Sequence, residues 1–193
     1  MSKKNKPKAF ISCSVRDEDL KFNTAIEKVV KRYGFEPCGT VGRHVNYAEP
    51  ISDSMKKEIQ ACDILVVAAP PRYIQSEISD KANLTYAIPE MIQVESAMAH
   101  SFEKPVVAFV QDGVNIGNFI PNITQYFLVD AQTYKVKASR QLKPFFKDLH
   151  KRVAVSIKEK DKEAFGWLVL FSFAVVGIYT AIKWIRRWFT TSE

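Results

Sequence analysis

Short apolar runs alternate with amphipathic helical segments along most of this chain. Runs rich in β-branched and aromatic residues predict strands at residues 8–14, 35–41, 64–70, 105–111 and 125–130. Strands that alternate with helices pair in parallel, with right-handed crossovers. The sequence therefore predicts an α/β fold, a flavodoxin-like doubly wound five-stranded parallel sheet with strand order 2-1-3-4-5.

The segments between and after these strands each show one apolar helical face. The expected faces are Leu20, Thr24, Ala25, Ile26, Val29, Val30 and Tyr33; Met55, Ile59 and Cys62; Met91, Glu95, Met98 and Phe102; and Leu142, Phe145, Phe146, Leu149 and Val153. Asp17 is expected to cap the first helix, and Ser52 or Asp53 the second. Residues 72–89 are expected to form a polar, irregular connection, and long connections are often functional.

The longest uncharged segment spans residues 164–182. As a helix it covers about 28 Å, close to the ~30 Å hydrocarbon core of a bilayer. Trp167 lies near one end and Trp184 near the other, as in an aromatic interface belt. The alternative is a buried core helix, but such a helix normally has a polar face. Residues 164–185 are therefore predicted to form a transmembrane helix.

Charge sets the expected organisation around this helix. Residues 1–7 are a disordered basic lead, 8–157 the α/β domain, 158–163 a charged linker and 186–193 a short tail. Basic residues are denser before the span than after it, which predicts a single-pass protein of the inner or plasma membrane with a cytoplasmic α/β domain. The net charge of +7 suits an anionic membrane or a phosphate-bearing ligand. No nucleic-acid motif is present, so no nucleic-acid partner is expected.

The cysteines and histidines show no pattern of a structural site. Three cysteines, an odd number at wide spacing, argue against a disulfide framework and fit a reducing cytosol. The three histidines lack metal-ligand spacing, so no metal is expected.

Two places in the predicted sheet carry candidate chemistry. Ser12, Ser14 and Arg16 follow the first strand just before a helix, where backbone N–H groups can bind an anion such as phosphate. The alternative is that Ser14 and Asp17 only cap that helix. Glu95 lies on an otherwise apolar helix face, so its carboxylate must be paired, hydrogen-bonded or functional.

Three further residues lie in loops after the second and third strands. Arg43 and Tyr47 belong to the loop at residues 42–50, and Tyr73 follows the third strand. They could contact a ligand at the carboxyl ends of the strands, or simply lie on a solvated surface. The spacing leaves both interpretations open.

The order of three motifs resembles Toll/interleukin-1 receptor (TIR) domains over residues 8–155. The motifs are FISCS at residues 10–14, ILVVAAPPRY at 64–73 and IQVESAM at 92–98. The resemblance implies a bacterial antiphage-defence protein in which Glu95 acts on the nicotinamide ribose of NAD, with Ser12 and Arg16 near the dinucleotide. NAD would be substrate, so no cofactor is implied. It also implies a homo-oligomer formed through this domain and a mobile loop at 42–50.

The same order is similar to nucleoside 2-deoxyribosyltransferases, whose nucleophilic glutamate precedes a K-P-V strand like residues 104–106. Both families break an N-glycosidic bond at the ribosyl C1′. Two functions therefore stay open. One is an NAD glycohydrolase or cyclase. The other is a non-catalytic, nucleotide-sensing or self-associating module whose membrane helix is the effector.

Overall fold

The computed structural model describes residues 6–39, 50–76 and 81–158. The chain divides into two compact units, Met1–Leu149 and His150–Glu193, and residues 150–158 of the second unit are helical. Within the described ranges no helix is long and apolar enough to cross a membrane. The predicted span at 164–185, most of its linker, its tail and most of the basic lead lie outside the described residues.

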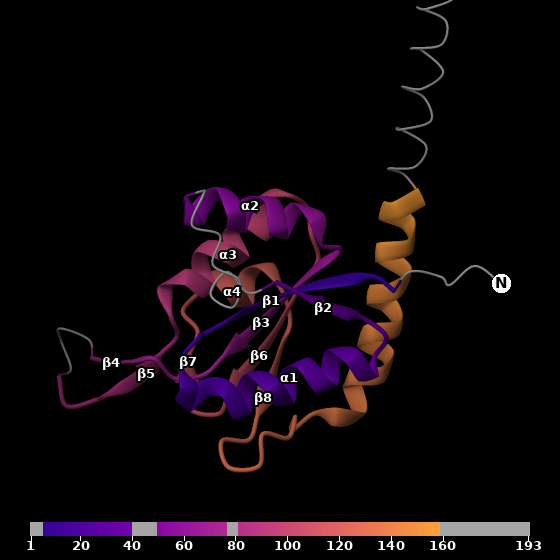
Figure 1. Cartoon of the computed structure of the whole chain (residues 1–193). Coiled ribbons are helices and arrows are strands. Elements are labelled where there is room, and N and C mark those ends of the chain that lie inside the picture. Colours follow the sequence, from indigo (N-terminus) through magenta and orange to yellow (C-terminus); the bar gives the residue numbers. More distant parts are fainter. Residues whose placement is uncertain (1–5, 40–49, 77–80, 159–193) are drawn as a thin grey trace, which may run out of the picture. The chain divides into compact units, whose positions relative to one another are not determined.

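A five-stranded parallel sheet forms the centre of the first unit (Figure 1). Its strands are β1 (Lys8–Cys13), β2 (Glu36–Cys38), β3 (Ile64–Ala69), β6 (Val106–Gln111) and β8 (Tyr126–Val129). The order is β2-β1-β3-β6-β8, and every neighbouring pair is parallel. The predicted order 2-1-3-4-5 is thus confirmed. All six residues of β3 are buried, because helices cover both faces of a central parallel strand.

Helices cover both faces of this sheet (Figure 1). They are α1 (Leu20–Arg32), which follows a short 3-10 turn (Asp17–Asp19), α2 (Ile51–Ala61), α3 (Glu90–Ser101), the short α4 (Phe119–Ile123) and, within this unit, the helical residues 139–149. Helices α2 and α3 share one core cluster with alternate residues of the strands, among them Phe10 and Leu65. On the other face, the rings of Tyr33 and Phe146 stack with centroids 4.6 Å apart.

The α2 face was predicted correctly, but α1 and α3 are rotated from their expected faces. Met55, Ile59 and Cys62 are buried as expected. In α1 the buried stripe is Phe22, Asn23, Ile26 and Val30, whereas Leu20 is 54% exposed. The 3-10 turn places Leu20 in the first helical turn, away from the sheet. Neither expected side-chain cap forms, since Asp19 and Pro50 occupy the N-cap positions without a capping hydrogen bond.

The sequence predicts an irregular connection at residues 72–89, but the structure has short strands there. These residues contain β4 (Tyr73–Gln75) and β5 (Thr85–Ala87), which pair antiparallel, and β5 also pairs with β7 (Val114–Asn115). This second sheet extends to the side of the main sheet (Figure 1). Strands of two or three residues give too short an alternating pattern to be recognised in a sequence.

Two of the three cysteines are joined, so the expectation of unpaired cysteines is wrong for them. Cys38 and Cys62 form a disulfide across 24 residues, with their Cα atoms 7.3 Å apart. Cys38 pairs with Phe10, and Phe10 pairs with Leu65 three residues after Cys62. The parallel sheet therefore brings together two cysteines that are distant along the chain.

Candidate functional site

Glu95 lies on the inner face of α3, as predicted. Its exposed fraction is 5%, and it shares the buried face with Ile92, Ser96 and Ala99. These positions follow the helical spacing of three and four residues. Met91, which was expected on the same face, is instead 47% exposed. Glu95 is thus a carboxyl group held inside an apolar helix–sheet interface.

Ser12 faces the same interface from β1. Side chains alternate along a strand, so Ser12 shares a face with Phe10, which belongs to the α2–α3 core. Ser12 is fully buried, and its hydroxyl has no hydrogen-bond partner of normal geometry among the described residues. The hydroxyl is nevertheless close enough to Glu95 to lower the pKa of its carboxyl group. The two groups are thus neighbours without a well-formed hydrogen bond.

Burial raises the pKa of Glu95 from 4.5 to about 7. Desolvation is the largest cause, the Ser12 hydroxyl acts in the opposite direction, and the negative charge of Glu58 raises the pKa further. The carboxyl group is therefore about half protonated at neutral pH. A carboxyl poised between its two forms near neutral pH is typical of catalytic sites, although structural networks can also produce it.

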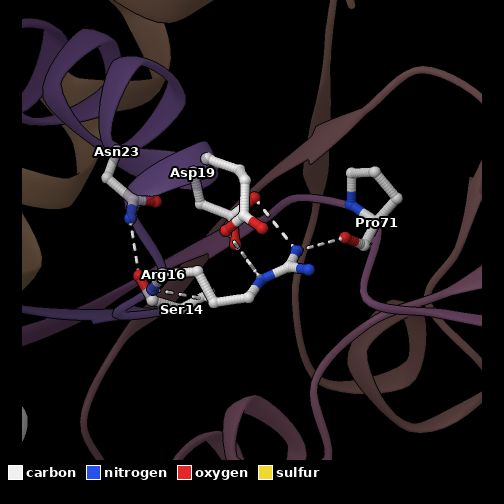
Figure 2. Close-up of polar contacts among 6 residues, drawn as sticks. Ser14, Arg16, Asp19, Asn23 and Pro71 are labelled. Carbon is white, nitrogen blue, oxygen red and sulfur yellow. Dashed lines mark hydrogen bonds and ion pairs between the residues drawn. The ribbon is translucent and has the colours of Figure 1, made fainter.

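The loop after β1 is held by Arg16 (Figure 2). Its Nε and Nη2 donate to the Asp19 carboxylate at 2.8 and 3.1 Å, and Nη2 also donates to the Pro71 carbonyl at 2.8 Å. Asn23 donates to the Ser14 carbonyl at 2.7 Å. These contacts tie the β1–α1 loop to the segment after β3. The Arg16 guanidinium thus fixes the shape of the strand ends beside the candidate site.

Replacing Arg16 by alanine is expected to lower the free energy of unfolding by about 2 kcal/mol, because it leaves the nearly buried Asp19 carboxylate without its partner. Urea denaturation of the full chain measures the change. Arg32→Ala, which removes an exposed arginine at the end of α1, is the matched control and is expected to cost much less. Equal losses in the two variants would contradict a specific role for the Arg16 contacts.

Of the predicted site residues in the later loops, the structure describes Tyr73. Tyr73 lies on β4, 45% exposed, with the Arg72 guanidinium 5.6 Å from its ring centroid. Arg43 and Tyr47 lie outside the described residues. Among the residues that are described, no group of three or more histidine, cysteine, aspartate or glutamate side chains could hold a metal ion.

Glu58 is the residue that the sequence analysis missed. It lies on α2 next to the buried Ile59, and its Oε2 atom is buried without a hydrogen-bond partner among the described residues. In the sequence only the neighbouring Ile59 shows apolar helical spacing, and no pattern marks Glu58 itself. The class defined by fold and site is therefore a flavodoxin-like α/β domain with a buried glutamate, a second carboxylate nearby and a buried serine hydroxyl.

Comparisons with known proteins add little to this description. No family model and no curated protein matches the chain. A CMP N-glycosidase, BcmB, from Clostridium botulinum is similar in structure, with 10% identity, a TM-score of 0.40, and coverage of 74% of this chain and 98% of that one. A diflavin flavoprotein A3 from Nostoc sp. has 15% identity, a TM-score of 0.41, and coverage of 81% and 99%. The strand order β2-β1-β3-β6-β8 of the main sheet is that of flavodoxin-like folds.

Proposed function

We propose that this domain cleaves an N-glycosidic bond between a base and a ribose, with Glu95 as the carboxylate that acts at C1′. NAD is the substrate that the resemblance to TIR domains suggests. The single observation that supports the proposal most is a glutamate that is 5% exposed, stands beside a buried serine, and has a pKa of about 7. Burying such a group costs free energy, and carboxyl groups with a pKa raised in this way are found most often at functional sites.

The chemistry requires one carboxylate in a dry place. When the C1′–N bond breaks, its electron pair leaves with the base and an oxocarbenium-like centre remains at C1′. Ionised Glu95 can stabilise that centre or attack it to form an ester, which water then hydrolyses. Nicotinamide leaves NAD as a neutral molecule, so its departure needs no proton from the protein. The ionised half of the Glu95 population would suffice.

The surrounding residues would assist without touching the reacting bond. Ser12 lies in the carboxyl-terminal part of β1, opposite Val67 of β3, and ligands of such folds bind beyond the carboxyl ends of the strands. Its hydroxyl stabilises the ionised form of Glu95. Arg16 keeps the neighbouring loop in place through Asp19 and Pro71. We assign these residues positioning roles.

The test uses the full chain, kept in solution with a non-ionic detergent, and NAD. Chromatography is expected to show release of nicotinamide together with ADP-ribose or a cyclic product. The rate should rise with pH through a midpoint near 7, because Glu95 must be ionised. At pH 6 it should be about a tenth of its plateau value. Folded protein that releases no base at any pH or protein concentration would contradict the proposal.

The low exposure of Glu95 also favours a second candidate, a domain that binds a nucleotide without turning it over. In that case the predicted helix at 164–185 would be the effector at the cytoplasmic membrane. Calorimetry that detects NAD binding without base release would support this candidate. In cells that express the chain, toxicity that persists in Glu95→Gln but disappears when residues 164–185 are deleted would support this candidate further.

A further inference from the structure

Glu58 brings a second carboxylate to the surroundings of Glu95. Helices α2 and α3 cover the same face of the sheet and contribute Ile59 and Ile92 to one core cluster. The Oε2 atom of Glu58 is buried and has no hydrogen-bond partner among the described residues. The buried side chain of Glu95 and the half-buried side chain of Glu58 therefore lie on the same face of the sheet.

Gly39 leaves the space that the Glu58 carboxylate occupies. A Cβ atom at position 39 would collide with Glu58 Oε2 and would lie 3.6 Å from the ring of Phe10. Phe10 and Ser12 point to the same face of β1, two residues apart. The carboxylate of Glu58 thus approaches the sheet beside β1, on the face where Ser12 and Glu95 lie.

The region offers little compensation for a negative charge on Glu95. The Ser12 hydroxyl is fully buried there and unpartnered at normal geometry. β3 presents only buried apolar residues, and in the described part of the chain Glu58 is the one charged group that acts on the pKa of Glu95. A negative charge near a poorly hydrated carboxyl group disfavours its ionised form, which here is that of Glu95.

We propose that Glu58 is a positioning residue of the candidate site that acts through Glu95: its negative charge helps to keep a proton on Glu95 and so moves upward the pH range in which Glu95 can act as an anion. When that proton leaves, it passes to solvent, and both carboxylates are then charged. The catalytic consequence rests on the function proposed above. The effect on protonation does not, and it can be measured without substrate.

The experiment is a pH titration of the full chain, labelled with ¹³C at glutamate carboxyl carbons and observed by NMR. The Glu95 signal is assigned by its absence in Glu95→Gln. In wild-type protein its midpoint should lie near 7. In Glu58→Gln it should fall by about half a pH unit or more, yet stay above the ordinary value, because burial remains the larger cause. Glu90→Gln, an exposed change on α3, should leave the midpoint unchanged.

An unchanged Glu95 midpoint in folded Glu58→Gln would overturn the proposal. If that variant fails to fold, the shorter Glu58→Asn removes the same charge, and its midpoint decides in the same way. Under the proposal, the midpoint of the pH–rate curve for base release falls together with the NMR midpoint. A shifted NMR midpoint without any base release would support the role of Glu58 and contradict the proposed function instead.

Discussion

Replacing Glu95 by glutamine is expected to reduce nicotinamide release from NAD about a thousandfold. Glutamine keeps the size of the side chain but can neither ionise nor form the ester, so the developing charge at C1′ loses its partner. Loss of a positioned catalytic group typically costs 10²–10⁴ in rate, and a thousandfold corresponds to about 4 kcal/mol of transition-state stabilisation. Single-turnover measurement of base release with the full chain checks the prediction.

The control for this substitution is Glu90→Gln in the same helix. Glu90 is exposed in the first turn of α3, whereas Glu95 is buried five residues later. The control should therefore retain wild-type activity. Activity in Glu95→Gln close to that of Glu90→Gln would remove Glu95 from the mechanism. Loss of activity in both variants would indicate damage to the helix rather than to the chemistry.

The strand order of the main sheet was predictable because burial on both faces leaves an unambiguous sequence pattern. The ILVVAA segment of β3 is apolar at every position, and all six residues are buried. The alternation of such runs with helical segments then restricts the topology to parallel pairing with crossovers. The inward position of Glu95 was also predicted correctly, although Met91 of the same expected face is exposed.

The rotation of α3 was not predictable from spacing. Apolar residues occur at Met91, Ile92, Val94 and Met98, so more than one face of the helix looks suitable for burial. Contact with the sheet selects the face of Ile92 and leaves Met91 and Val94 exposed. Such a choice depends on tertiary packing, which overrides a weak pattern.

The remaining features depend on residues that meet only in three dimensions. The Glu58 carboxylate occupies its place because position 39 carries no side chain. Cys38 and Cys62 meet because β2 pairs with β1, and β1 with β3. The spacing of these residues along the chain predicts neither contact. Helix and strand periodicity reports which face is buried, but not which buried face meets which.

Glu95 should also make the stability of the protein depend on pH. Its pKa is about 7 in the folded protein, against 4.5 as the ordinary value. Below pH 4.5 the group is protonated in both the folded and the unfolded chain, so it does not make the free energy of unfolding depend on pH there. As pH rises toward 7, the unfolded chain releases the proton first, so the folded state loses stability. The loss amounts to about 3 kcal/mol and is complete above pH 7.

Glu95→Gln should therefore be less sensitive to alkaline pH than the wild-type chain. Between pH 4.5 and 8.5, urea denaturation of both proteins should show the variant gaining about 3 kcal/mol relative to wild type. The offset from burying an amide is the same at both pH values and cancels in this comparison, as do the titrating groups that do not interact with Glu95. For a domain of this size the gain corresponds to roughly 6–12 °C in melting temperature. Glu90→Gln should gain nothing. A pH-independent difference between Glu95→Gln and wild type would mean that Glu95 ionises as readily in the folded chain as in the unfolded one, and the proposed catalytic role would then lose its electrostatic basis.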